Sequence, residues 1–115
     1  MEYMLLIYGN EKQMQGRSQA DNEAMHAAYV AYGEALRKAG VYVGGNRLKP
    51  AEMATVVRAA NGKTQVLNGP YAETKEQLGG YFMIEAPDLD AAISWASRCP
   101  GASHGTMEVR PIWNM

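Results

Sequence analysis

Residues 68–80 read NGPYAETKEQLGG and separate two parts of the chain that each contain apolar strand patterns and one helix pattern. The run opens with a turn signal, continues with charged residues and ends in paired glycines. It is too polar for a core strand, and its flanking glycines are atypical of an ordinary helix. We therefore expect any functional site to be built around this run.

The chain before the run begins with a strand and a helix. Residues 3–9 alternate with apolar side chains on both faces, which predicts a central strand. Ser18, with Asp21 three residues later, predicts the start of a helix that runs to about Ala39 and stops at Gly40. Its apolar positions repeat at helical spacing, at Met25, Ala28, Tyr29, Tyr32, Leu36 and Ala39.

The middle of the chain predicts a further strand and a hairpin. Residues 41–48 are extended in character, and extended character resumes at residues 53–59 after a turn at Lys49 and Pro50. Asn61-Gly62 suits a type I′ turn, in which both central residues need positive φ. It would join residues 55–59 to residues 63–67.

The chain after the run repeats the order strand, helix, strand. We expect strands at residues 80–85 and 106–112. Between them, Pro87-Asp88 predicts a helix start and Pro100-Gly101 predicts its end. The predicted buried stripe of this helix is Leu89, Ala92, Ile93 and Ala96.

This order resembles a ferredoxin-like α+β sheet with an inserted β-hairpin, formed as a single domain over residues 1–115. Two helices can cover only one face of the sheet. Because the first strand is apolar on both faces, the uncovered face needs a partner. A symmetric homodimer packed sheet to sheet is the simplest solution.

Charge and composition exclude several classes of partner. The net charge of −1 comes from 11 basic and 12 acidic residues without a run of like charge, so neither nucleic acid nor an anionic membrane is favoured. The longest apolar run, residues 3–8, is far shorter than the ~20 residues of a membrane helix. We expect a cytoplasmic protein.

The sequence favours neither a metal nor a cofactor. His26 and His104 are far apart, and neither HExxH nor paired CxxC occurs. The single cysteine, Cys99, cannot close an internal disulfide, and its position before Pro100 favours a buried structural thiol over a nucleophile.

The densest polar cluster lies inside the opening run, at Glu73, Lys75, Glu76 and Gln77. Such a turn can bind a small polar ligand, with Glu73 as base or anchor and Lys75 as the contact for an anion. The alternative is a solvated charged loop.

A second candidate pair is Glu108 and Arg110, which lie two apart on a strand and so share a face. Arg110 could hold a carboxylate or phosphate, whereas the alternative is a structural ion pair. If the face that carries Glu108 and Arg110 lines a cavity, three tyrosines could line it too, namely Tyr8, Tyr71 and Tyr81. The alternative for each tyrosine is packing in the core or in an interface.

The run, together with MEYMLLIYG at residues 1–9 and GTMEVRPI at residues 105–112, resembles the YCII-related family, and ETKEQLGG at residues 73–80 resembles the motif of its DGPF branch. The resemblance covers nearly the whole chain. It implies a ferredoxin-like fold of the dimeric α+β barrel type, in dimers that share a cavity.

Two departures from the family bear on chemistry. The branch is named for Asp-Gly-Pro-Phe, whereas this chain has Asn68-Gly69-Pro70-Tyr71, and an Asn cannot exchange a proton as an Asp can. A His and Asp pair with the His on the first helix has been proposed for YCII-like proteins. Here Tyr29 lies nearer that register than His26, and the resemblance assigns the role to neither.

Two functions follow as hypotheses. The first is a small dimeric protein that binds a small polar or anionic metabolite near residues 68–80, with cofactor-free acid or base chemistry as an open extension. Its candidate ligand-binding residues are Asn68, Glu73, Lys75, Gln77, Tyr81, Glu108 and Arg110. The second comes from the resemblance alone: a non-enzymatic accessory or regulatory module that acts with an extracytoplasmic-function sigma factor. Whether the protein is an enzyme stays open.

Overall fold

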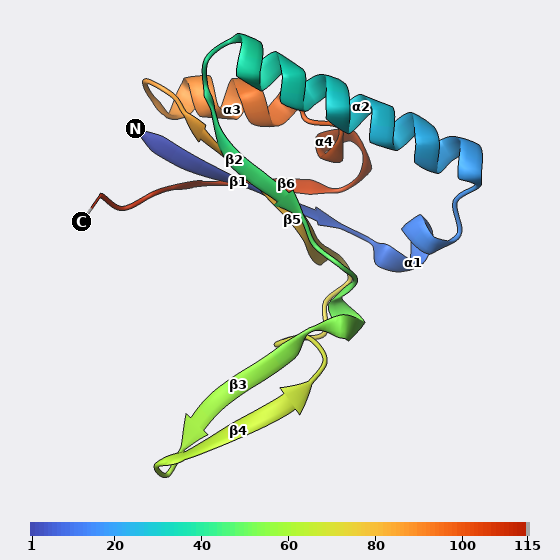
Figure 1. Ribbon diagram of the computed structural model, residues 1–115, viewed down its shortest axis with the longest axis vertical. Helices are drawn as coiled ribbons and strands as arrows, with labels where there is room; N and C mark the ends of the chain where they lie inside the picture. Colours follow the sequence, from blue (N-terminus) through green and yellow to red (C-terminus); the bar gives the residue numbers. More distant parts are fainter. Residues whose placement is uncertain (115) are drawn as a thin grey trace.

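The computed structural model describes residues 1–114, which form the α+β fold shown in Figure 1. The helical elements are α1 (Glu11–Gln15), α2 (Gln19–Lys38), a 3-10 turn η1 (Ala51–Met53), α3 (Leu89–Arg98) and α4 (Gly101–His104). The strands are β1 (Glu2–Gly9), β2 (Tyr42–Arg47), β3 (Thr55–Ala60), β4 (Lys63–Asn68), β5 (Gln77–Glu85) and β6 (Thr106–Pro111).

Four strands form the main sheet in the order β2-β5-β1-β6, with every neighbouring pair antiparallel. β1 therefore lies inside the sheet, as its apolar faces predicted. α2 and α3 lie on one side of this sheet (Figure 1). The expected ferredoxin-like arrangement is confirmed.

The core fills the space between the sheet and the two long helices. It consists of Tyr3, Leu5, Tyr32, Leu36, Ile84, Ala86, Ala92, Ala96 and Cys99. The burial of Cys99, at 2% exposure, confirms that it is a core thiol.

On the opposite side of the sheet no helix lies among residues 1–114, and we call this side the open face (Figure 1). Register places the side chains of Met4, Leu6, Tyr8, Tyr81, Met83, Glu108 and Arg110 there. Most of these side chains are half-buried, which leaves an apolar sheet surface partly in contact with solvent.

Local signals fixed α2 as predicted. The Ser18 hydroxyl accepts a hydrogen bond of 3.1 Å from the Asp21 amide, and Gly40 follows the helix with φ of 74°. Tyr32 and Leu36 are buried, whereas Ala28 and Ala39, also assigned to the apolar stripe, are exposed.

The predicted buried stripe of α3 is half wrong. Asp88 caps the helix, and Ala92 and Ala96 face the sheet, but Leu89 and Ile93 are each 48% exposed. The inward face also includes Ala91 and the half-buried Trp95, so its centre is rotated away from Leu89 and Ile93. The small alanines let α3 approach the sheet closely.

Pro100-Gly101 was expected only to end a helix, but α3 already ends at Arg98 and Gly101 begins α4. A Cβ on Gly101 would lie 2.7 Å from Ile7 Cγ2, and one on Gly105 would lie 2.0 Å from the Tyr8 carbonyl oxygen. The two glycines therefore allow α4 to pack directly onto β1.

The structure differs from expectation in three segments of the chain. β5 begins at Gln77 and not at Gly80, so the last four residues of the opening run belong to a strand. The polar stretch after β1 contains α1, which Asn10 caps by accepting a 3.1 Å hydrogen bond from the Gln13 amide. In the middle of the chain, η1 occupies residues 51–53 and β3 starts at Thr55, two residues after the expected extended segment.

β3 and β4 form a separate two-stranded sheet, which we call the arm (residues 55–68). Asn61 and Gly62 at its tip have φ of 52° and 77°, so the predicted hairpin turn is confirmed. Figure 1 shows the arm extending away from the rest of the fold. The radius of gyration is accordingly 16.0 Å, against about 13 Å for a compact chain of this length.

Among residues 1–114, no helix is long and apolar enough to cross a membrane.

Candidate functional site

The first half of the opening run is exposed at the base of the arm. Asn68 ends β4, and Gly69, with φ of 101°, donates a 2.7 Å hydrogen bond to the Ala54 carbonyl. Tyr71 is 78% exposed and Glu73 is exposed as well. This part of the run is therefore an exposed turn, tied to Ala54 by the Gly69 amide, and none of its polar side chains is buried.

The second half of the run is tied to neighbouring elements. The Gln77 side chain accepts a 3.0 Å hydrogen bond from the Glu11 amide and donates one of 2.6 Å to the Thr74 carbonyl. The Glu76 carboxylate accepts a 2.7 Å bond from the Thr106 hydroxyl. Gln77, a predicted ligand residue, therefore holds the run against α1.

A hollow of about 530 Å³ lies next to the run, and we call it the motif hollow. It is lined by Asn10, Gln13, Lys75 and Glu76. Of the seven ligand-binding candidates, Lys75 alone is among these lining residues. All four side chains are polar, so the hollow offers hydrogen bonds and charge but no apolar wall.

The pair Glu108 and Arg110 lies on the open face, as its spacing predicted. Arg110 Nε donates a 3.0 Å hydrogen bond to Glu108 Oε2, and the Tyr8 hydroxyl donates one of 3.1 Å to Oε1. The bond from Arg110, followed by that from Tyr8, lowers the pKa of Glu108. Burial, together with the Glu108 bond, raises the pKa of Tyr8.

Tyr81 lies on β5, two strands away from Glu108 and Arg110, and its hydroxyl accepts a 3.0 Å hydrogen bond from Asn46 Nδ2. The sequence candidates thus occupy three regions: the base of the arm, the motif hollow and the open face. The fold does not bring them together within one copy of the chain.

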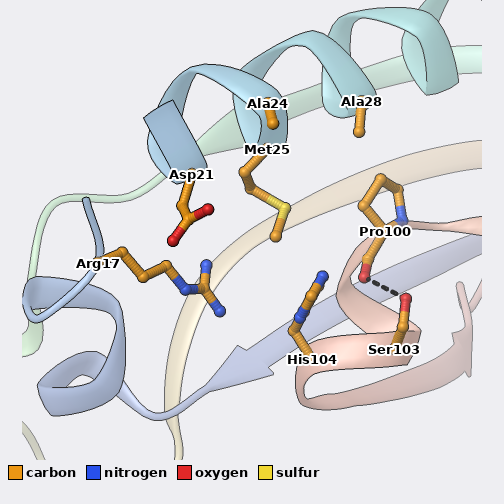
Figure 2. Close-up of a pocket in the computed structure, with 8 residues that line it drawn as sticks. All are labelled: Arg17, Asp21, Ala24, Met25, Ala28, Pro100, Ser103 and His104. Carbon is orange, nitrogen blue, oxygen red and sulfur yellow. Dashed lines mark hydrogen bonds between the residues drawn. The ribbon is translucent and has the colours of Figure 1, made fainter. Parts of the chain in front are cut away.

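A second hollow, of about 580 Å³, lies between α2 and α4, and we call it the α2–α4 hollow. Figure 2 shows the side chains around it. The lining residues are Arg17, Asp21, Ala24, Met25, Ala28, Pro100, Ser103 and His104. The hollow exists because Gly101 and Gly105 let α4 pack onto β1 beneath the N-terminal half of α2.

The α2–α4 hollow combines an apolar wall with a cation. Met25, Ala28 and Pro100 form the wall, while Arg17 and His104 reach in from opposite sides (Figure 2). Arg17 is half-buried. In the part of the chain that the structure describes, the ion pairs are Met1–Glu85 and Glu108–Arg110, so Arg17 forms none. The nearest carboxylate of the hollow is that of Asp21, drawn beside Arg17 in Figure 2.

Tyr29 and Cys99 lie close to this hollow and close enough to each other that each changes the pKa of the other. A Cβ on Gly101 of α4 would lie 2.9 Å from the Tyr29 hydroxyl. Burial raises the pKa of Tyr29 to about 12 and also raises the pKa of Cys99. Both groups are therefore neutral at pH 7, when they act as hydrogen-bonding groups and not as a base.

Sequence reasoning did not select Arg17 or Met25 for a site. Arg17 immediately precedes the α2 cap, and Met25 reads as an ordinary core position. His104 was considered for metal binding only. The one local signal in the sequence was the glycine pair Gly101 and Gly105 at the two ends of α4. Such a pair is compatible with close packing but does not indicate a hollow.

The model of the YCII-related domain matches residues 1–115 of this chain. The chain belongs to the YCII-related family. This confirms the family resemblance drawn from the run and the two terminal strands, while the DGPF branch stays a prediction.

Two comparisons place this YCII-related protein among known ones. It is 35% identical over 114 residues to an uncharacterised protein of Rhizobium meliloti (strain 1021), which covers 97% of this chain and 92% of the relative. Its fold is similar to that of 5-chloro-2-hydroxyhydroquinone dehydrochlorinase (TftG) from Burkholderia phenoliruptrix AC1100, solved with 2,5-dihydroxybenzoquinone. That likeness has a TM-score of 0.55 at 20% identity and covers 99% of this chain and 94% of the other, so it shows the fold alone.

Proposed function

We propose that this YCII-related protein binds a small organic anion in the α2–α4 hollow. The observation that carries the proposal is Arg17, a half-buried cation beside an apolar wall that forms no ion pair, although the Asp21 carboxylate lies next to it on the rim (Figure 2). A guanidinium can hold a carboxylate through two parallel hydrogen bonds. The volume of the α2–α4 hollow, about 580 Å³, lies in the range of small-molecule sites, roughly 300–1,000 Å³.

The remaining lining residues narrow the class of ligand. Met25, Ala28 and Pro100 suit a compact apolar body, such as an aromatic ring. Asp21 lies on the same rim and can accept a hydrogen bond from a ligand hydroxyl. A hydroxylated aromatic or short aliphatic carboxylic acid meets all three requirements.

The neighbouring pair Tyr29 and Cys99 favours binding over proton transfer. Because burial keeps both groups protonated at neutral pH, neither can take a proton from a ligand. The proposal is supported by TftG, a protein of similar fold that was solved with the small ligand 2,5-dihydroxybenzoquinone. The protein is proposed as a binder, and acid or base chemistry is not part of the proposal.

The motif hollow is the second candidate for the anion. Lys75 supplies the cation there, and Asn10 and Gln13 supply hydrogen bonds. Glu73 was expected to share this role and is exposed close to Lys75 in the chain. The combined change Glu73→Ala and Lys75→Ala abolishes binding if this hollow is the site and leaves it intact if the α2–α4 hollow is.

We also propose a homodimer in which the second copy covers the open face. The support is the half-buried apolar surface of Met4, Leu6 and Met83 on a sheet whose other face carries both long helices. A monomer would leave this surface in water.

An accessory module for a sigma factor is the alternative function. It is favoured by the exposed apolar side chains of the arm, which could bind another protein. Co-purification of a sigma factor, combined with no response to any small acid, would support this alternative. The cytoplasm is the proposed location for either function.

The ligand proposal is tested with 4-hydroxybenzoate as an anionic probe and 4-hydroxybenzamide as its neutral counterpart. Thermal-shift titration is expected to show stabilisation by the acid only. Arg17→Gln should weaken the response by about 10- to 100-fold, the effect of losing a charged hydrogen bond. The matched control Arg58→Gln removes the same charge from the arm and should change nothing. Equal responses from Arg17→Gln and the original chain would reject the site.

A further inference from the structure

The arm has two chemically different faces. Strand alternation and the register of β3 with β4 place Val57 opposite Val66 on one face. That face, which we call the uncharged face, consists of Thr55, Val57, Ala59, Thr64, Val66 and Asn68. The other face carries both charged residues of the arm, Arg58 and Lys63.

The charged face has a contact from its own chain, since the Arg58 guanidinium lies 5.2 Å from the centre of the Tyr71 ring. On the uncharged face, Val57 and Val66 are each 63% exposed. A two-stranded hairpin is at best marginally stable in water when neither face is packed. Leu67 on the charged face is 51% exposed as well, but it shares that face with two cations, so the uncharged face is the one better suited to an apolar partner.

The arm cannot supply this partner by folding back onto its own sheet. Two hydrogen bonds hold its base, Leu48 amide to Gly79 carbonyl at 2.9 Å and Gly69 amide to Ala54 carbonyl at 2.7 Å. Figure 1 shows the arm leaving the sheet where β2 ends and β5 begins, and pointing away from the sheet. One copy thus has two partly apolar surfaces that do not meet, around Val57 and Val66 on the uncharged face and around Met4, Leu6 and Met83 on the open face.

We infer that the uncharged face of the arm docks on the open face of a second copy of this chain. This inference rests on the homodimer proposed above and adds the element that forms its contact. A twofold axis lets each arm cover the partner's open face, so both apolar surfaces are buried and no surface remains for further growth.

Dimensions and charge fit this arrangement. A strand of six residues spans about 20 Å, and four strands make a sheet about 19 Å wide, so an arm can lie across the partner's sheet. The arm has a charge of +2 from Arg58 and Lys63, which leaves −3 for the remainder of the chain. The opposite net charges of the arm and of the remainder favour a contact between the arm of one copy and the body of the other.

The test compares two neighbouring substitutions that add the same charge on opposite faces of the arm. Sedimentation of the full chain at micromolar concentration should show a dimer. Val66→Glu should give a monomer, whereas Gln65→Glu should remain dimeric. Far-UV circular dichroism checks that the body of Val66→Glu is folded. A dimer of undiminished affinity in Val66→Glu, or a monomeric original chain, would overturn the inference.

Cross-linking gives an independent readout that does not depend on the stability of the Val66→Glu hairpin. Val66→Cys and Met4→Cys proteins, mixed under oxidising conditions, should form a disulfide-linked pair, because Cys99 is buried and does not compete. Gln65→Cys mixed with Met4→Cys is the control, and equal cross-linking in the two mixtures would contradict the docking. Stabilisation of monomeric Val66→Glu by 4-hydroxybenzoate is read separately, so failure of the ligand proposal is distinguished from failure of the arm contact.

Discussion

Tyr29 of α2 and Cys99 at the end of α3 lie next to each other beside the α2–α4 hollow, and each changes the pKa of the other. Burial is the largest cause of the raised pKa of both groups. The pair joins two elements 70 positions apart in the chain and is neutral at physiological pH. Its neutrality leads to two predictions about reactivity and pH.

Cys99 should react slowly with thiol reagents in the folded protein. The thiolate is the reactive species, and the raised pKa of Cys99 makes the thiolate scarce. Burial also keeps the reagent away from the sulfur. With Ellman's reagent at pH 8, the native rate should be on the order of 100-fold below that of the chain in guanidinium chloride. Comparable native and denatured rates would show that the thiol is accessible.

Alkali should destabilise the fold through Tyr29. Its pKa is about 12 in the folded protein and about 10 in the unfolded chain, so between these values the folded state binds more protons. The free energy of unfolding must then fall as the pH rises from 10 to 12. Urea denaturation at pH 9 and pH 11 measures this loss, which should be smaller in Tyr29→Phe. An equal loss in that variant would assign the effect to other groups.

Tyr32→Phe should lower the stability of the fold. The Tyr32 hydroxyl donates a 2.6 Å hydrogen bond to the Trp95 carbonyl and so links α2 to α3. Without the hydroxyl, that carbonyl loses its partner in the core, at a cost of about 1–3 kcal/mol. Urea denaturation measures the change. Tyr71→Phe, at a position 78% exposed, is the control, and two variants of equal stability would count against the core link.

Gly105→Ala should destabilise the protein by about 2–4 kcal/mol through steric overlap. The new Cβ would lie 2.0 Å from the Tyr8 carbonyl oxygen, so α4 would have to move away from β1. Gly44→Ala adds the same methyl group where nothing lies within 4 Å and should have little effect. The unfolding midpoints of the two variants make the comparison, and equal midpoints would refute the packing argument.

Features that depend on neighbouring residues were predictable from the sequence. The Asn61-Gly62 turn, the Ser18 and Asp88 caps and the central position of β1 each rest on short-range chemistry that the structure preserves. The buried face of α3 was less predictable. Leu89 and Ile93 fit a helical stripe, yet the small side chains of Ala92 and Ala96 decide which side packs on the sheet.

The candidate site was predictable only in part. Residues 73–77 were recognised as polar and Lys75 does line a hollow, because charge density can be read locally. The α2–α4 hollow depends on contacts between distant segments: Gly101 approaches Ile7, and Arg17 comes to lie opposite His104. Such a meeting of a loop, a helix and a turn leaves no periodic pattern in the sequence.

The central claim is that Arg17 and the wall beside it hold a small organic anion, and the Met25 methyl group reports on this directly. In methyl NMR spectra of the protein, 4-hydroxybenzoate should shift the Met25 signal in a saturable way. Arg17→Gln should require about 10- to 100-fold more of the acid to reach the same shift. A Met25 signal that does not move, or an unchanged affinity in Arg17→Gln, would contradict the claim.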